Sequence, residues 1–421
     1  MDWQEARAQF AACRRGIAYL NTGALGLISD RVADAEAAWK EYVREYGRAS
    51  PSVLGCIENG AQAAFGDGPG GAARTWVGVN RLSERLADLM HVGDSQMYFT
   101  ANTTDGMARA SASLRWAPGE RLLITDAEHN SVPANARDAA SEHPISIDVA
   151  KVQDLFGEKD FEQKWIDAIV DKVAANTRLV VVSEILWHLG LVLPVPELVR
   201  RCKVKNPSTV VMVDGAHTLG QLEVNVQGLG CDMYATAGHK WLCAPSGSGV
   251  LVVTNELNDR KDFRLRIRRA WGEPESGRRA ARAVDPSWGR ESTSQIDWSA
   301  VQESTLIGLG AALDSYEELG VAAVAERVRY LATAAVERLS TVKRISVLPG
   351  AGAPRQTGIV AFAVDGVTNR EQAGALVDQL ERRFKVACRW VGDPPLVRAC
   401  FHYHNNEDDI EALRRGLSEL L

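Results

Sequence analysis

The chain has 421 residues, of which 46% are hydrophobic and 24% are charged, and its formal net charge is −6. A chain of this length can bury a large core and form one large domain and one smaller domain. The acidic balance argues against a surface for nucleic acids or anionic membranes, so we expect neither partner.

Apolar segments and cysteines favour a reduced, cytoplasmic protein. The longest apolar runs, such as 179–182 and 250–253, have the length of strands and fall far short of a membrane span. The first ten residues, MDWQEARAQF, are charged and show no signal peptide. The seven cysteines form no Cys-x-x-Cys pair and their number is odd, so we expect free thiols and no structural disulfide.

The first part of the chain is predicted to alternate strands and helices. An extended segment at 16–29 precedes a helix at 30–46, a glycine-rich loop at 47–72 and a helix at about 74–91. Seven short apolar strands follow, at 96–100, 121–125, 145–149, 179–185, 209–213, 232–235 and 249–254. Helices are expected between the earlier strands, at 104–116, 131–141, 160–175 and 195–203. This alternation predicts an α/β fold with a mostly parallel seven-stranded sheet flanked by helices.

The pattern changes in the last third of the chain. Residues 260–300 are rich in Arg, Gly and Trp and show no clear periodicity. A linking helix at about 300–320 leads into a smaller α+β unit, with helices at 321–340, 369–384 and 407–420 and strands at 358–364, 386–390 and 396–403. We therefore predict a large domain at 31–300, a small C-terminal domain at 301–421, and an N-terminal segment, 1–30, that packs with the small domain.

An acid and a lysine follow two neighbouring strands of the predicted sheet. Asp214 directly follows the strand at 209–213, and Lys240 comes shortly after the strand at 232–235. This pair suits pyridoxal 5′-phosphate (PLP): the lysine forms a Schiff base with the aldehyde, and the acid keeps the pyridine nitrogen protonated. Trp241 and Pro245 beside Lys240 would desolvate the amine and lower its pKa. The ordinary alternative for a lysine after a strand is an exposed position.

Other polar residues occupy strand ends in the same way. Thr103 and Thr104 open a helix directly after the strand at 96–100, where hydroxyl and backbone N–H groups can hold a phosphate, or can form a simple helix cap. His129 follows the next strand and suits stacking on a planar cofactor, although a polar loop position is equally common. Arg389 and Arg398 flank the two last strands and offer a bidentate site for a carboxylate, or surface ion pairs.

Two rival sites fit less well. Asp214, His217 and His239 can be drawn as zinc ligands, but their spacing is not that of a compact helical pair and Lys240 would then have no role. The glycines at 66–71 do not follow a strand, so a dinucleotide-binding loop is not expected. We predict no metal ion.

These motifs together resemble the class V aminotransferase family of fold-type I PLP enzymes, which includes cysteine desulfurases, isopenicillin-N epimerase-like proteins and C–S lyases. The likeness runs from Tyr19-Leu-Asn-Thr-Gly23 to the C-terminal helix. Its most specific parts are Val213-Asp-Gly-Ala-His-Thr-Leu-Gly220, Gly238-His-Lys240 and Val397-Arg-Ala-Cys-Phe-His-Tyr-His-Asn405.

The resemblance implies a role for each matching residue. Lys240 would be the Schiff-base lysine, Asp214 the partner of the pyridine nitrogen, and His217 a contact of the phenolic oxygen. His129 would stack on the ring and also could relay protons. The phosphate would be held by four residues of this chain, namely Thr103, Thr104, His239 and Thr236, the last because Ala237 stands where the family has a serine.

A homodimer with shared active sites is also implied. In the family, a Gly-Thr or Ser-Thr loop of the neighbouring subunit completes the phosphate site, and Ser292 and Thr293 stand at the matching place.

The substrate side departs from the family pattern. Arg389 matches the arginine that binds the substrate carboxylate, but the following loop, 390–395, is short and has no cysteine, so we do not expect a persulfide-forming cysteine desulfurase. Trp187 stands where the family usually has Asn. Together with Trp390 and Asn21, it is expected to contact the substrate, and the tryptophans suggest a bulky one.

The sequence therefore predicts a PLP enzyme that takes an amino-acid-type substrate and acts at its Cα or Cβ. We expect a C–S lyase or an epimerase for a bulky modified amino acid of secondary metabolism. The alternatives are a decarboxylating, oxygen-dependent deaminase, an aminotransferase, and a non-catalytic PLP-binding paralogue.

Overall fold

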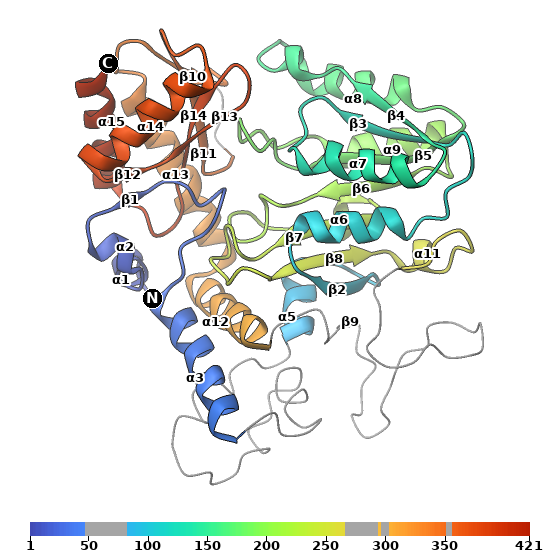
Figure 1. Cartoon of the computed structure of the whole chain (residues 1–421), viewed down its shortest axis with the longest axis horizontal. Coiled ribbons are helices and arrows are strands. Elements are labelled where there is room, and N and C mark those ends of the chain that lie inside the picture. The colour runs from blue at the N-terminus through green and yellow to red at the C-terminus, as the bar shows by residue number, and fades with distance from the viewer. Residues whose placement is uncertain (47–81, 266–293, 296–302, 351–355) are drawn as a thin grey trace.

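The computed structural model describes residues 1–46, 82–265, 294–295, 303–350 and 356–421. Figure 1 shows a large sheet covered by helices on both faces and, beside it, a smaller sheet with its own helices. Within the described residues, no helix is long and apolar enough to cross a bilayer.

The large sheet has the strand order β4-β3-β5-β6-β7-β8-β2-β9. Its seven longer strands are β2 (Gln96–Thr100), β3 (Arg121–Thr125), β4 (Ser146–Ala150), β5 (Thr177–Ser183), β6 (Val210–Asp214), β7 (Met233–Ala237) and β8 (Gly249–Val253). All neighbours from β4 to β7 are parallel, whereas β8 runs antiparallel to both β7 and β2. The predicted fold class is confirmed. The short β9 (Ser294–Gln295), parallel to β2, was not predicted because its segment carries no periodic pattern.

The large domain also contains the helices that precede, connect and follow these strands. They are α3 (Asp30–Tyr46), α5 (Leu82–Leu89), α6 (Thr103–Ala112), α7 (Ser131–Glu142), α8 (Phe161–Lys172), α9 (Val195–Lys205), α10 (Val226–Leu229), α11 (Asn255–Asn258) and α12 (Glu303–Leu319), with a 3₁₀ turn at Gln153–Leu155. The central strands β5, β6 and β7 are fully buried because both faces are covered, which is typical of parallel sheets, whereas the edge strand β4 is only partly buried.

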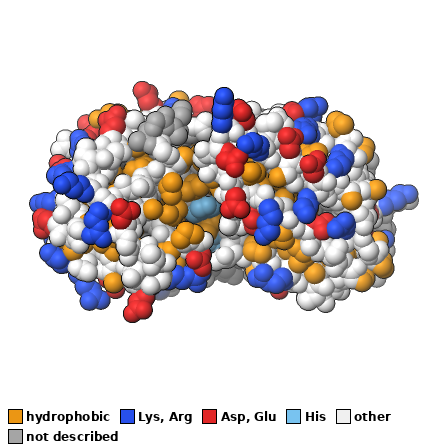
Figure 2. Space-filling view, turned by 90° about the horizontal axis from the view of Figure 1, so that it is seen from above, with side chains coloured by type: hydrophobic (Ala, Val, Ile, Leu, Met, Phe, Trp, Pro, Cys, Tyr) orange, Lys and Arg blue, Asp and Glu red, His pale blue; other side chains and the backbone are white. Residues whose placement is uncertain are grey.

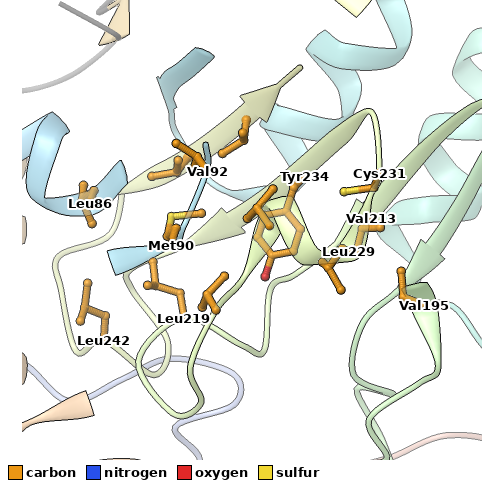
Figure 3. Packing of buried hydrophobic residues seen from close by; sticks show 14 of the residues in the cluster. Leu86, Met90, Val92, Val195, Val213, Leu219, Leu229, Cys231, Tyr234 and Leu242 are labelled. Atoms are coloured by element: carbon orange, nitrogen blue, oxygen red, sulfur yellow. The ribbon is translucent and has the colours of Figure 1, made fainter. Parts of the chain in front are cut away.

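The core under the sheet is continuous and close-packed. Figure 3 shows Tyr234, Val213, Leu219 and Met90 pointing toward one another between β6, β7 and the neighbouring turns. The hydroxyl of Tyr234 is satisfied there, because it donates to Glu184 Oε2 at 2.7 Å. Burial of such side chains stabilises the fold by about 25 cal/mol per Å² of apolar surface.

The small sheet is antiparallel, in the order β10-β11-β14-β13. Its strands are β10 (Ile345–Leu348), β11 (Ile359–Val364), β13 (Arg389–Val391) and β14 (Leu396–Cys400), and its helices are α13 (Val321–Leu339), α14 (Arg370–Phe384) and α15 (Glu407–Leu420). Strand β10 was missed in the sequence. The N-terminal segment holds α1 (Trp3–Ala8), α2 (Ala11–Arg14) and β1 (Ala18–Tyr19), and β1 pairs in parallel with β12 (Val386–Ala387). The exact domain borders stay a prediction.

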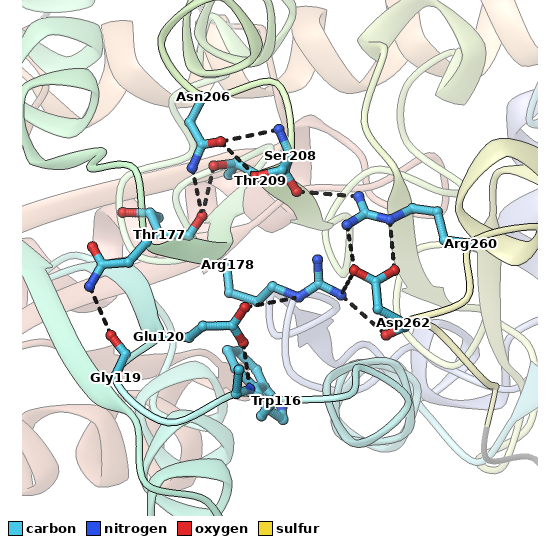
Figure 4. A network of polar contacts seen from close by, with 12 residues as sticks. Trp116, Gly119, Glu120, Thr177, Arg178, Asn206, Ser208, Thr209, Arg260 and Asp262 are labelled. Carbon is cyan, nitrogen blue, oxygen red and sulfur yellow. Dashed lines mark hydrogen bonds and ion pairs between the residues drawn. The ribbon is translucent and has the colours of Figure 1, made fainter.

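The two edges of the large sheet carry different side chains. At the amino edge, Arg178 forms an ion pair with Asp262 at 2.9 Å, and Asn206 donates to three backbone carbonyls (Figure 4). At the carboxyl edge the turns after several strands meet. Strand β2 ends at this same edge, because two antiparallel steps through β8 make it parallel to β7.

Candidate active site

A cavity of about 730 Å³ opens at the carboxyl edge of the large sheet. The turns after β2, β3, β5, β6 and β7 line one side, and Arg389 of β13 and Arg398 of β14 line the other. Seen from above, the middle of the molecule shows a histidine side chain among hydrophobic ones (Figure 2). The parallel topology therefore brings residues far apart in the sequence to one cavity.

Lys240 and Asp214 meet in this cavity. Burial lowers the pKa of Lys240 to about 8, the negative charge of Asp214 opposes the decrease, and the positive charge of Arg398 adds to it. An amine with this pKa is partly neutral near pH 8 and can act as nucleophile or base. Its Nζ lies 3.4 Å from His217 Nε2.

A glycine brings the two turns of the site together. Gly220 has a φ of +98°, and a Cβ placed on it would lie 2.2 Å from the backbone nitrogen of Leu242. Only glycine permits both this conformation and this close approach. The turn after β6, which carries His217, is thereby packed against the turn that carries Lys240.

Asp214 is buried and faces the cavity. Its Oδ1 accepts a hydrogen bond from the backbone N–H of Ala216 at 2.9 Å. Burial raises the pKa of Asp214, and the charge of Lys240 acts in the opposite direction. A buried carboxylate of this kind needs a cationic or donating partner, and the protonated pyridine nitrogen of PLP is one.

The helix after β2 offers free hydrogen-bond donors to an anion. Asn102 caps α6 by accepting from the backbone N–H of Asp105, while the hydroxyl of Thr103 is buried and has no hydrogen-bond partner among the described residues. Nδ1 of His239 is in the same state. Thr104 also lines the cavity. Donors without a partner at a helix N-terminus fit a phosphate, so the residues present here fit PLP.

His129 lies beside Trp187 on the wall of the cavity. The two rings meet edge-on, with centroids 5.3 Å apart and an interplanar angle of 89°. His129 Nδ1 is 2.9 Å from the hydroxyl of Ser131. Burial and the charge of Lys240 lower the pKa of His129 to about 4, so the ring is neutral at pH 7 and can stack on a flat ligand.

Two arginines face these groups from the small sheet. Arg398 is 2% exposed, and its Nη1 donates to the carbonyl oxygen of Trp187 at 2.7 Å. Burial lowers its pKa. Neither Arg398 nor the exposed Arg389 forms an ion pair within the described part of the chain. A substrate carboxylate would supply the missing negative charge.

Three further predicted residues, Thr236, Trp390 and Asn21, are not among the described residues that line the cavity. The hydroxyl of Thr236 is buried and donates to Gly215 O at 2.8 Å, and Trp390 packs against Arg370 with the guanidinium 5.8 Å from the ring centroid. Asn21 forms a β-bridge with Cys400, and its side-chain oxygen is buried without a partner among the described residues. Ser292 and Thr293 lie outside the described residues. The roles of all these residues stay predictions.

Sequence reasoning missed several residues of the cavity. They are Asn102, Ser131, Ser183, Ser246 and Gly247. Asn102, Ser131 and Ser183 end a strand or open a helix, so the strand-end signal that selected Thr103 and His129 could have included them, whereas Ser246 and Gly247 precede β8 and carry no such signal. A buried acid beside the site was also missed. Glu128 accepts hydrogen bonds from Thr125 and Ser183, and burial raises its pKa to about 7.

Comparisons with known proteins agree with this geometry. The family model "Aminotransferase class-V" matches residues 71–413. The chain is 28% identical to a cysteine desulfurase of Dickeya dadantii (strain 3937) over 369 residues, which cover 83% of this chain and 82% of the relative. It is 26% identical to a probable cysteine desulfurase of Halalkalibacterium halodurans over 356 residues, covering 81% of this chain and 82% of the relative.

Solved structures share the fold over almost the whole chain. A mutant of C-DES with glycine covalently linked to PLP superposes with a TM-score of 0.79 at 24% identity, covering 98% of this chain and 99% of that one. The cysteine desulfurase CsdA from Escherichia coli superposes with a TM-score of 0.74 at 20% identity, covering 100% and 99%.

Two functional expectations are corrected by these findings. The curated relatives are cysteine desulfurases, so the expected epimerase, deaminase or aminotransferase for a bulky amino acid of secondary metabolism is wrong. The lyase class is not contradicted, because one similar solved structure holds the cystine C-S lyase C-DES. The exclusion of a persulfide-forming desulfurase is wrong as well. It rested on the composition of the single loop 390–395, whereas the similarity covers four-fifths of the chain, and a thiol acceptor need not lie in that loop.

The family match, the shared fold and the residues of the cavity lead to one conclusion: the chain belongs to the class V aminotransferase family, and its cofactor is pyridoxal 5′-phosphate.

Proposed function

We propose that this chain is a PLP-dependent enzyme of the cysteine desulfurase type, which breaks the carbon–sulfur bond of L-cysteine. One observation carries the proposal: Lys240, Asp214 and two arginines that have no ion-pair partner among the described residues, Arg389 and Arg398, face one cavity. The similarity to curated cysteine desulfurases selects the reaction among those that such a site supports.

The charged residues bind and orient the amino acid. Arg398, helped by Arg389, would hold the substrate carboxylate, because a buried guanidinium gains most from a bidentate anion. The hydrogen bond from Arg398 to Trp187 O fixes the guanidinium in place. Bound PLP supplies an electron sink for the bonds of the substrate Cα.

Proton transfer falls to Lys240. With its pKa at about 8, a fraction of its amine is neutral at physiological pH and can take the Cα proton. Asp214 would keep the pyridine nitrogen protonated, and the neutral His129 ring would cover the cofactor face. Sulfur leaves Cβ and joins a thiol as a persulfide, while Cβ gains a proton, so cysteine and a thiol give alanine and a persulfide.

The thiol that accepts the sulfur is either a cysteine of this chain or a separate small molecule. The six described cysteines are buried and none lines the cavity. Cys56 lies outside the described residues. We therefore propose an added small thiol as acceptor, and a Cys56→Ser variant tests whether the chain supplies one itself.

Product analysis tests the reaction. The PLP-loaded protein is incubated with L-cysteine and dithiothreitol, and alanine, sulfide and pyruvate are measured. Alanine and sulfide in equal amounts support the proposal. If cysteine, or cystine as a second substrate, gives pyruvate and ammonia instead, the reaction is elimination and not desulfuration. The absence of all products would contradict the proposal.

We also propose that the protein is a cytoplasmic homodimer in which Ser292 and Thr293 complete the partner's phosphate site. Mixing Lys240→Ala subunits with Thr293→Ala subunits tests this. A hybrid dimer with shared sites has one site with both native residues, so activity should reappear on mixing. Two independent sites would stay inactive.

A further inference from the structure

The tryptophan that follows the active-site lysine touches the histidine beside it. Trp241 has no exposed surface, and its Nε1 lies 3.2 Å from His217 Nδ1. On the other side of the same imidazole, Nε2 lies 3.4 Å from Lys240 Nζ. The three residues form one chain of contacts that ends in the cavity.

The chemistry of the indole decides the direction of this contact. An indole nitrogen carries a hydrogen and only donates, so His217 Nδ1 must accept and cannot itself carry a hydrogen. A neutral imidazole has one N–H, which then belongs to Nε2. The site environment also disfavours a doubly protonated ring, because burial and the charge of Lys240 lower the pKa of His217.

Trp241 is held firmly enough to impose this choice. Its ring packs in a buried cluster with Ile185, Ile359 and Cys400. His402 meets it edge-on, with ring centroids 5.4 Å apart and an interplanar angle of 89°, and His402 Nε2 also contacts the backbone oxygen of Trp241. Side chain and backbone are thus fixed from two directions.

We propose that Trp241 is a positioning residue: its indole N–H holds His217 in the Nε2–H tautomer, so that the imidazole always directs a hydrogen-bond donor at Lys240 and at the ligand beside it. This inference rests on the proposed PLP site, because the donor matters only if a ligand oxygen or a neutral Lys240 amine is there to accept it.

Nitrogen NMR of the histidine rings tests the tautomer directly. The protein is labelled with ¹⁵N-histidine, and the His217 signals are identified by their loss in His217→Gln. In the native protein, with or without PLP, we expect a protonated Nε2 and an unprotonated Nδ1. A protonated Nδ1 in the native protein would overturn the proposal, whatever the variants do.

Two tryptophan variants separate this effect from a loss of packing. Trp241→Phe keeps an aromatic ring but removes the donor, and we expect the His217 signals to shift toward a mixture of tautomers. Trp116→Phe is the matched control, because Trp116 is also buried and its Nε1 donates over the same 3.2 Å, to Ser111 O, away from the cavity. It should leave the His217 signals unchanged. Equal His217 signals in Trp241→Phe and the native protein would also contradict the proposal.

Activity gives an independent measure. One hydrogen bond of ordinary strength corresponds to about a tenfold effect, so Trp241→Phe should lower kcat about tenfold and Trp116→Phe should not. If the native protein lacks desulfurase activity, the proposed function fails, but the NMR result still decides the tautomer.

Discussion

The two edges of the large sheet treat charge in opposite ways. At the amino edge, Arg178 is neutralised by Asp262 at 2.9 Å and Lys203 by Asp232 at 2.7 Å. At the carboxyl edge, the half-buried Lys240 and the buried Arg398 have no ion-pair partner among the described residues. Paired charges hold a fold together, whereas unpaired buried charges cost free energy unless a ligand neutralises them. The unpaired charges therefore identify the carboxyl edge as the edge that binds the ligand.

Replacing Lys240 and Lys203 in turn by alanine tests this comparison and has the largest expected effect. Lys240→Ala should lower turnover at least about 1,000-fold, because it removes nucleophile and base together. Lys203→Ala should leave kcat within about twofold but lower the thermal midpoint, because Asp232 loses its partner. Activity assays and thermal unfolding of both variants are the measurement. A catalytic loss in Lys203→Ala as large as in Lys240→Ala would break the comparison.

The two buried arginines, Arg398 at the carboxyl edge and Arg178 at the amino edge, allow a second comparison. Arg398→Met should reduce kcat/KM on the order of 100-fold, since the substrate loses charge-assisted hydrogen bonds, while stability is kept or improved. Arg178→Met should retain kcat/KM but lose about 1–2 kcal/mol of stability, a reduced value because Asp262 is 44% exposed. The two quantities come from steady-state kinetics and urea unfolding. If Arg398→Met loses stability and keeps activity, Arg398 belongs to the fold rather than to the substrate site.

The pH dependence of cofactor uptake sharpens the assignment of Lys240. Attack on the PLP aldehyde needs the neutral amine, and the pKa of Lys240 is lowered to about 8. The rate of PLP uptake by cofactor-free protein should therefore rise with pH and level off above a midpoint near 8. Because Asp214 raises this pKa, Asp214→Asn should move the midpoint to lower pH. Stopped-flow absorbance records both, and a midpoint near that of an exposed lysine would count against a buried nucleophile.

The last prediction concerns the stability of the protein and the carboxyl group of Glu128, beneath the cavity. Its pKa is raised to about 7 in the folded protein, so the folded state binds more protons than the unfolded state above pH ~4.5. Stability should consequently fall as pH rises from about 4.5 to 7. The Glu128→Gln variant has no carboxyl group to titrate at this position. The difference in the free energy of unfolding between the variant and the native protein should therefore shift in favour of the variant over this range, by up to about 3 kcal/mol. Urea unfolding at pH 5 and pH 8 measures the difference, and an equal difference at both pH values would contradict it.

Residues at strand ends were the most predictable part of the site. Asp214, Lys240, Thr103 and His129 each follow an apolar strand, and parallel topology brings such positions to one edge. The β-strand Ile345–Leu348 was missed because it is short and only partly buried. Contacts between turns could not be predicted from the sequence either. The indole of Trp241 meets His217 only because Gly220, with its φ of +98°, lets the two turns approach, and no periodicity encodes that.

Reduction with borohydride followed by peptide mass analysis identifies the lysine that carries the cofactor. PLP-loaded protein is reduced, digested and searched for a lysine that carries the cofactor. We expect one modified peptide, containing Lys240, and none in Lys240→Ala. Modification of a different lysine, or no modification of a protein that folds normally, would contradict the assignment of the carboxyl edge as the cofactor site.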